Sequence, residues 1–208
     1  MKLVVFGATG GTGLRVVEQS LAKSYEVTAF VRGEPGPLAN LAGVRIVQGD
    51  VLNPEDVVCA VAGQDAVISV LGVAGNGRAP IVSEGNRNIV NAMKKLGIER
   101  LIVQSAHGAA ESAREIFLPV RLVMRGWLLR NPFIDKDRME RIVKESGIKW
   151  TIVRPTRLTN APATGRYRAG EHIRLGLSPS ISRSDVADFL IKQIESQEYL
   201  NKKPTVTS

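Results

Sequence analysis

Three glycines near the start of the chain have the spacing of a loop that binds a diphosphate. Gly7, Gly10 and Gly13 follow an apolar run at residues 3–6 and precede apolar residues at helical spacing. A strand, a glycine turn and a helix in this order indicate a dinucleotide site, because the turn admits a pyrophosphate to the helix N-terminus. The alternative is a plain glycine-rich turn. The cofactor-binding residues predicted here are Gly7, Thr9, Gly10, Gly11, Thr12 and Gly13.

Arg32 indicates which dinucleotide is bound. It directly follows a second apolar segment, residues 26–31. Near this position an acidic residue holds the ribose of NAD(H), whereas an arginine suits the 2′-phosphate of NADP(H). The planar guanidinium can bind phosphate through two hydrogen bonds at once. We therefore predict NADP(H) as the cofactor, against the alternative of a surface arginine at a strand end.

Strands and helices alternate along the rest of the chain. This alternation predicts an α/β fold, a single doubly wound parallel-sheet (Rossmann) domain over residues 1–208 with helices on both faces. Asn53 and Ser182 are suited to cap two of the helices. The predicted strands are residues 2–6, 26–31, 44–48, 65–71, 100–105 and 150–154, and the predicted helices are 12–23, one beginning at 54, 80–96, 134–146 and 183–196.

In such sheets the ligand lies outside the carboxyl ends of the strands, so the residues that follow each strand are candidates. We predict that Asp50 accepts a hydrogen bond from the adenine amino group and that Val51 lies beside the ring. The alternative for Asp50 is an acid that caps the following helix. Leu71 and Gly72 are expected beneath the ribose on the nicotinamide side.

Composition limits the class of protein. The net charge is +8, most of it in residues 101–208, but the basic residues lack the interleaved aromatics of a nucleic-acid platform. No apolar run reaches the roughly 20 residues of a membrane span. Cys59 is the single cysteine and lies in an apolar segment, so we expect a buried, inert thiol. We expect a cytoplasmic protein, a monomer rather than a dimer, with no metal, no nucleic-acid partner and no integral membrane segment.

Several motifs resemble the atypical short-chain dehydrogenase/reductases, including the NmrA-like proteins. They lie at residues 7–13, 49–52, 63–68, 83–93 and 145–155 and extend over nearly the whole chain. Within that family the pattern is most similar to the group of biliverdin-IXβ reductases, also called NADPH-dependent flavin reductases. The resemblance implies a Rossmann fold, NADP(H) as cofactor and a planar small-molecule acceptor.

The resemblance also implies a catalytic set, which this chain carries only in part. Ser105 matches the family serine and Lys136 the family lysine, but Pro132 stands where the family tyrosine is expected. Reduction of an ordinary ketone needs a proton donor, so the missing tyrosine argues against it. No tyrosine closely follows the predicted strand at 100–105; the three are Tyr25, Tyr167 and Tyr199.

Other residues could contact the substrate. His107 could donate a proton or a hydrogen bond to the acceptor, although a solvated loop histidine is the alternative. The resemblance implies that Pro155 and Thr156 line the nicotinamide carboxamide. Arg154 and Arg157 are candidates for binding a substrate anion.

Residues 116–130 combine large apolar side chains with arginines and no acid. We expect a substrate lid within residues 108–133, in which Arg121, Arg125 and Trp127 contact an anionic planar ring. The alternatives are an amphipathic helix that binds a membrane surface or a partner, and a helix packed on the core.

Together these observations predict an NADPH-dependent reductase that transfers hydride to a planar conjugated acceptor. The acceptor would be a flavin such as FMN or a linear tetrapyrrole of the biliverdin type, because their reduced anions are delocalised and need no protein acid. The alternative is an NADP(H)-binding protein without turnover, either a redox sensor or a scaffold for assembly.

Overall fold

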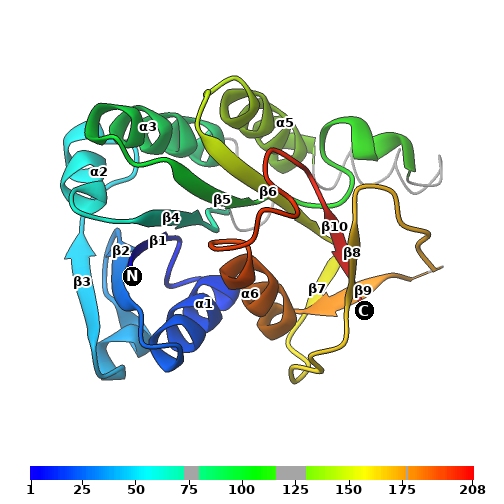
Figure 1. Ribbon diagram of the computed structural model, residues 1–208, viewed down its shortest axis with the longest axis horizontal. Helices are drawn as coiled ribbons and strands as arrows, with labels where there is room; N and C mark the ends of the chain where they lie inside the picture. The colour runs from blue at the N-terminus through cyan, green and yellow to red at the C-terminus, as the bar shows by residue number, and fades with distance from the viewer. Residues whose placement is uncertain (73–79, 116–129, 177) are drawn as a thin grey trace.

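The computed structural model describes residues 1–72, 80–115, 130–176 and 178–208. Within these ranges eight strands form one sheet in the order β3-β2-β1-β4-β5-β6-β10-β8 (Figure 1). All neighbouring strands are parallel except β10 and β8. The strands are β1 (Lys2–Phe6), β2 (Glu26–Val31), β3 (Val44–Gln48), β4 (Ala66–Ser69), β5 (Arg100–Gln104), β6 (Lys149–Pro155), β8 (Arg168–Gly170) and β10 (Thr205–Thr207).

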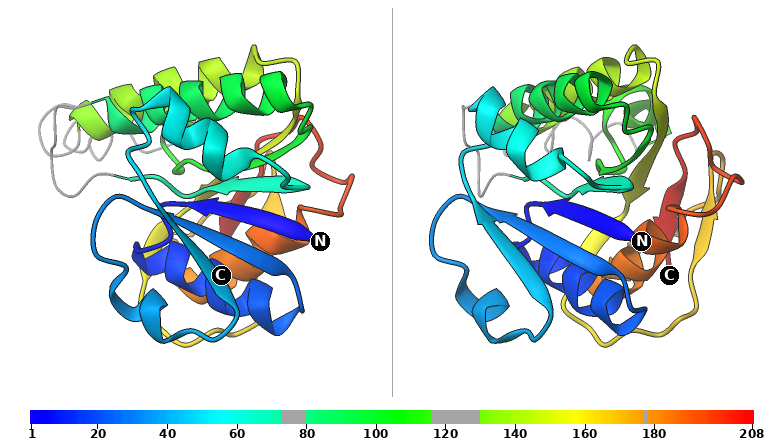
Figure 2. Two further views of the ribbon diagram at one scale, coloured as in Figure 1. Left: turned by 90° about the vertical axis from the view of Figure 1, so that its left-hand side faces the viewer. Right: turned by 60° about the vertical axis from the view of Figure 1, so that its left-hand side comes forward.

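Helices cover both faces of this sheet, as Figures 1 and 2 show. One face carries α1 (Gly11–Ala22) and α6 (Arg183–Lys192), and the other carries α2 (Pro54–Val61), α3 (Ile81–Leu96) and α5 (Arg130–Lys144). Two short 3-10 helices, η1 (Gly36–Asn40) and η2 (Ala110–Glu115), lie in connections. A separate parallel pair, β7 (Arg157–Thr159) with β9 (Ser180–Ser182), precedes α6. The predicted doubly wound fold is thus confirmed.

The alternation of side chains along β1 explains the two layers of core. Leu3 and Val5 pack into the cluster on the side of α1 and α6. Val4 and Phe6 pack into the cluster on the opposite side, with residues of α2, α3 and α5. Successive side chains of a strand point to opposite faces. A strand buried on both faces must therefore be continuously apolar, as this one is.

The strand order reverses beside β1, which lies between β2 and β4. The parallel strands end at a common edge, and α1 begins there (Figure 2). Phe6, the last residue of β1, pairs with Phe30 on one side and Ser69 on the other. This is the switch point at which doubly wound sheets bind their ligands.

Some predicted boundaries differ from the structure. The helix predicted from residue 134 is already formed at Arg130, where the described part of α5 starts. The helix predicted to reach residue 196 ends at Lys192. Pro155 was expected to end a strand but belongs to β6. It fits because the N–H groups that bond β10 and the chain before it are those of Arg154 and Thr156.

The prediction of a buried Cys59 was wrong, because its side chain is exposed. The buried residues of α2 are Val57, Ala60 and Val61, which lie three and four positions apart on one face. Cys59 falls on the other face. No helix in the described ranges combines the length and apolar composition needed to cross a bilayer.

Candidate active site

Two glycines of the first loop are required by the fold itself. Gly7 has a φ of +80°, and a Cβ there would lie 2.7 Å from the carbonyl oxygen of Val70. A Cβ on Gly13 would lie 2.1 Å from the carbonyl oxygen of Gly7. Both approaches are shorter than atoms allow, so Gly13 lets α1 lie close to the end of β1, and Gly7 lets the chain after β1 lie close to the chain after β4.

Gly10 differs, because an added side chain there would meet the protein less severely. Its φ is −72°, and the nearest atom to an added Cβ would be the Gly7 carbonyl oxygen at 3.2 Å. Gly10 is the N-cap of α1 and supplies no side-chain hydrogen bond, and no acid stands in the first turn. The first N–H groups of α1 therefore have no side-chain cap. This arrangement fits a diphosphate, since the positive helix end and its N–H groups attract an anion.

The predicted adenosine-side residues lie at the same edge of the sheet. Arg32 is exposed and directly follows β2. Asp50 does not cap α2, since Asn53 does so by accepting a hydrogen bond from the backbone of Glu55. Asp50 Oδ1 instead accepts from the Leu52 N–H at 2.9 Å and shapes the turn after β3.

Val51 and Leu71 come together against α3. A Cβ on Gly85 would lie 3.0 Å from a methyl group of Val51 and 2.9 Å from one of Leu71. Val51 is buried and Leu71 is half-buried, whereas Gly72 is exposed. Val51, which lies after β3, and Leu71, which lies after β4, thus form one apolar surface beside Gly85.

Ser105 lies directly after β5 and is bound to a buried carboxylate. Its hydroxyl donates to Glu140 Oε1 at 2.6 Å. Arg154 donates to the same carboxylate, from Nε at 3.0 Å and from Nη2 at 2.5 Å. Glu140 and Arg154 are almost completely buried. The two-point contact with arginine identifies Glu140 as an ionised carboxylate, which can only accept hydrogen bonds.

This ion pair continues to the C-terminal segment. Arg154 Nη2 also lies 3.1 Å from Glu111 of η2, and Glu111 pairs with Lys203. Burial alone would lower the pKa of Arg154, but the hydrogen bonds and charges of Glu140 and Glu111 outweigh burial and raise it. The prediction that Arg154 binds a substrate anion was therefore wrong, because its charge is satisfied within the protein by Glu140 and Glu111.

Lys136 lies one helical turn before Glu140 on α5. Burial lowers the pKa of Lys136 to about 8, while the charges of Glu140 and Asp135 oppose that shift. Asp135 itself accepts hydrogen bonds from the Val82 and Ser83 N–H groups and so caps α3. The side chains at 135 and 140 thus fix α5 to the neighbouring elements around Lys136.

His107 and Thr156 lie near the end of β6. The His107 N–H donates to the carbonyl oxygen of Pro155 at 2.9 Å, so that its loop follows the strand end. Thr156 is buried, and its hydroxyl bonds that of Thr207 at 3.1 Å. Arg157, at the start of β7, is exposed.

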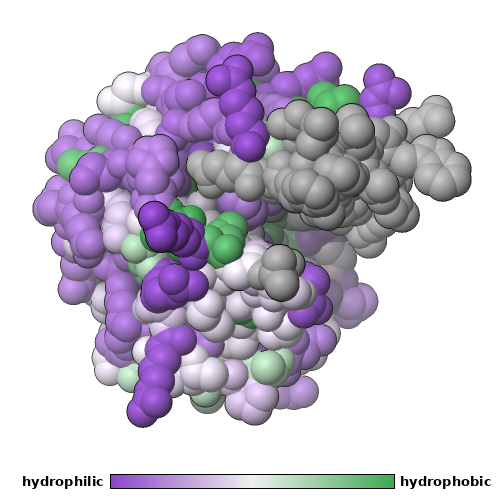
Figure 3. Space-filling model, turned by 90° about the vertical axis from the view of Figure 1, so that its right-hand side faces the viewer, coloured by the Kyte–Doolittle hydropathy of each residue, from purple (hydrophilic) through white to green (hydrophobic). Residues whose placement is uncertain are grey.

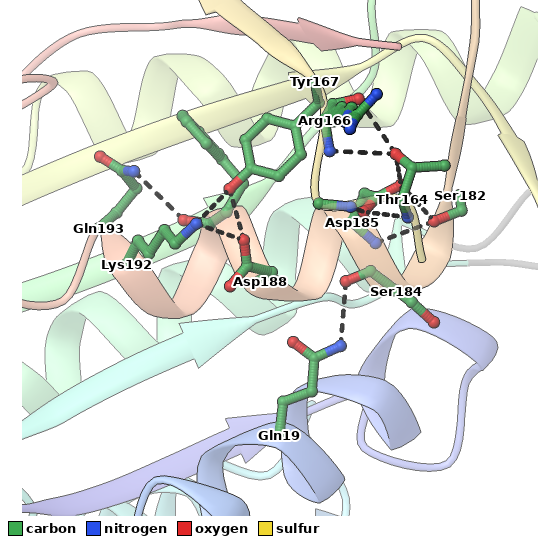
Figure 4. Close-up of polar contacts among 12 residues, drawn as sticks. Gln19, Thr164, Arg166, Tyr167, Ser182, Ser184, Asp185, Asp188, Lys192 and Gln193 are labelled. Atoms are coloured by element: carbon green, nitrogen blue, oxygen red, sulfur yellow. Dashed lines mark hydrogen bonds and ion pairs between the residues drawn. The ribbon is translucent and has the colours of Figure 1, made fainter. Parts of the chain in front are cut away.

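The three tyrosines of the chain all lie away from Ser105. They pack against the cluster on the side of α1 and α6, whereas Met139, next to Glu140, belongs to the opposite cluster. Tyr167 donates to Asp188 at 2.6 Å (Figure 4), and burial together with that bond raises its pKa to about 12. The others bond Glu195 and the Ala169 carbonyl oxygen. None replaces the missing tyrosine.

The predicted lid is described only at its two ends, as η2 and the start of α5. Arg121, Arg125 and Trp127 lie outside the described residues. On the side of the molecule that lies to the right in Figure 1, hydrophilic residues predominate and a small hydrophobic area lies near the centre (Figure 3).

Sequence reasoning missed the importance of Glu140. The only signal is its spacing of four residues from Lys136, which places the two on one face of a helix. Of its partners, Ser105 directly follows β5 and Arg154 belongs to β6, and the parallel pairing of these two strands brings them together.

Comparisons with known proteins agree with this geometry. A protein of Arabidopsis thaliana, "Uncharacterized protein At2g34460, chloroplastic", is 32% identical over 95% of this chain and 73% of its own length. "Uncharacterized sugar epimerase YhfK" of Bacillus subtilis is 29% identical over 97% of this chain and 92% of its own. The solved structure "ChuY: An Anaerobillin Reductase from Escherichia coli O157:H7" superposes with a TM-score of 0.84 at 22% identity, covering 99% and 96% of the two chains.

The model of a family described as NAD(P)H-binding matches residues 7–197. That range includes the glycine loop, Ser105, Lys136 and Glu140, and the cofactor is accordingly NAD(P)H. The chain belongs to the NAD(P)H-binding family, and its fold is that of the Rossmann proteins.

Proposed function

We propose that this protein is an NADPH-dependent reductase of a planar conjugated acceptor, either a flavin such as FMN or a linear tetrapyrrole of the biliverdin type. The observation that carries the proposal is the absence of a tyrosine at the site in a chain that keeps Ser105 and Lys136. NADPH, when bound, supplies a hydride from its nicotinamide ring. The protein's task is then to align the two rings and to hold the acceptor's charge.

The hydrogen bond of Ser105 supports a positioning role. Its proton is directed to Glu140, which is acceptor-only, so the hydroxyl of this buried serine can take part in a further hydrogen bond only as an acceptor. In this arrangement Ser105 accepts a hydrogen bond from the nicotinamide or the acceptor and does not deliver a proton. A conjugated ring tolerates this, because the charge it gains is delocalised.

Lys136 is suited to hold a ribose or an anionic group of the acceptor. Because its pKa is lowered to about 8, its positive charge is lost as the pH rises through that value. Affinity for an anionic acceptor should therefore fall above pH 8, and this dependence should disappear in Lys136→Met. His107 and the exposed Arg157 are further groups that we place beside the acceptor.

The preference for NADPH over NADH rests on Arg32, an exposed arginine at the carboxyl end of β2. In doubly wound folds the residue that follows this strand commonly contacts the adenosine ribose, which supports this role for Arg32. The similarity to a structure named as a reductase is consistent with the proposed chemistry. Epimerisation, which the name of the Bacillus relative suggests, requires proton transfers at carbon or oxygen for which this site holds no tyrosine.

The test is acceptor-dependent oxidation of NADPH across flavins, biliverdin isomers, quinones and UDP-sugars. We expect turnover with at least one flavin or bilin and a primary isotope effect with C4-deuterated NADPH in stopped-flow. Ser105→Ala should slow hydride transfer modestly, by less than the 10²–10⁴-fold that removal of an essential proton donor costs. Saturable NADPH binding without turnover on any acceptor would overturn the proposal in favour of a sensor or scaffold.

A further inference from the structure

Arg183, the first residue of α6, lies against the glycine loop. A Cβ added to Gly11 would meet its side chain, at 2.8 Å from Cδ and 2.9 Å from Nε. Gly11 is the first residue of α1 and directly follows the N-cap Gly10. The absence of a side chain at Gly11 therefore admits Arg183 to the helix N-terminus where the pyrophosphate of the cofactor is expected.

The position of Arg183 is fixed by the elements around it. Its Nη1 donates to Asn160 Oδ1 at 2.8 Å. The first turn of α6 is held by Ser182, which accepts from the Asp185 N–H at 3.0 Å and donates to the Asp185 carboxylate at 2.8 Å. Gln19 of α1 donates to the carbonyl oxygen of Ser184 at 3.0 Å (Figure 4). The bond from Gln19 to Ser184 joins the start of α6 to α1 and so keeps Arg183 close to α1.

Asp185 strengthens this anchor. It accepts from the N–H groups of Thr164 and Gly165 (Figure 4). Burial opposes its ionisation, but these bonds and that of Ser182 outweigh burial and lower the pKa of Asp185. The Asp185 carboxylate therefore accepts its hydrogen bonds from its own helix and from the neighbouring loop.

Two positive groups lie near Gly11, the guanidinium of Arg183 and the N-terminus of α1, and together they favour the binding of an anion. Among the described residues Arg183 has a neutral amide as its polar partner and forms no ion pair with a carboxylate. A guanidinium has five N–H donors and cannot lose its charge. The N-terminus of α1 carries about half a positive charge more and has no acid in its first turn. Two positive groups that are held close together repel each other, and an anion bound between or beside them offsets this repulsion.

We propose that Arg183 is a binding residue for the pyrophosphate of NAD(P)H. The N–H groups of α1 would hold the diphosphate from one side and the guanidinium of Arg183 would hold it from another. Arg183 would then act on every dinucleotide, whereas Arg32 acts only on one with a 2′-phosphate. The proposal concerns binding alone and stands whichever acceptor the protein reduces.

The test is titration calorimetry of NADPH, NADH and ADP-ribose with Arg183→Gln. We expect all three dissociation constants to rise by a similar factor, about ten- to hundredfold, since each ligand carries the pyrophosphate. The difference from the native protein should shrink as salt is raised, because salt screens exposed charges. Arg183→Lys should recover part of the affinity.

Arg15→Gln is the matched control, because it removes one arginine of α1 that is paired with Glu18 on the surface. It should leave the three constants unchanged. If Arg183→Gln does not fold, Asn160→Ala releases the guanidinium without changing any charge and should weaken all three ligands severalfold. A folded Arg183→Gln that binds NADPH and NADH as the native protein does would overturn the proposal, and so would a loss confined to NADPH.

Discussion

Replacement of Glu140 by glutamine tests whether the buried ion pair stabilises the fold. The side chains of Glu140 and Arg154 are only 1% and 5% exposed, and Glu140 Oε2 lies 2.5 Å from Arg154 Nη2. In Glu140→Gln a neutral amide replaces the carboxylate that faces Arg154. Ser105 then donates to an amide or loses its acceptor. Removing one member of a buried pair costs about 3–5 kcal/mol, because the other charge stays buried.

The lower part of that range is expected here, since Glu111 remains 3.1 Å from Arg154 in the variant. For a chain of this size each kcal/mol lowers the melting temperature by about 2–4 °C, so a fall of roughly 6–12 °C should follow. Urea unfolding followed by circular dichroism and by Trp150, which is buried, would measure the loss.

Glu99→Gln is the control for this measurement. Glu99 and Lys149 lie 2.6 Å apart but expose 68% and 57% of their side chains. Solvent screens such a pair, so no measurable change is expected. Equal effects of Glu140→Gln and Glu99→Gln would refute the reasoning that burial decides the strength of these pairs.

Three further outcomes follow from the same structure. Gly13→Ala should strongly destabilise the apo-protein in thermal unfolding, because the Cβ would lie 2.1 Å from the Gly7 carbonyl oxygen. Gly10→Val, whose Cβ would lie 3.2 Å from the same oxygen, should lower the melting temperature less and should abolish NADPH binding in calorimetry. Arg32→Ala should raise the dissociation constant of NADPH about ten- to hundredfold and leave that of NADH unchanged; equal native affinities for the two would contradict the NADPH preference. Burial opposes ionisation of Glu111, but its bonds to neighbouring cations lower its pKa from 4.5 to about 2, so the stability it contributes is complete above about pH 4.5 and is lost as the pH falls towards 2. Glu111→Gln should flatten the pH dependence of unfolding in that window, and an unchanged profile would count against the assignment.

The sequence alone determined the fold class and the position of the glycine turn between the first strand and the first helix. Short apolar runs bounded by glycine, such as residues 3–6, are typical of strands that are buried on both faces, and the glycines that follow indicate one known kind of turn. These are local patterns, and they predicted the strands β1 to β6, although β4 is shorter (Ala66–Ser69) than the predicted residues 65–71. The short strands β7, β9 and β10 carry no such pattern, because partners distant in the chain stabilise them.

The tertiary structure decided which side chains meet. Arg154 was predicted to bind substrate, yet it lies against Glu140, because β5, β6 and α5 bring Ser105, Glu140 and Arg154 together. Arg183 is separated from Gly11 by most of the chain and contacts it only because α6 packs beside α1. Spacing along a sequence fixes contacts within one helix or strand, whereas contacts between elements depend on how the whole sheet is wound.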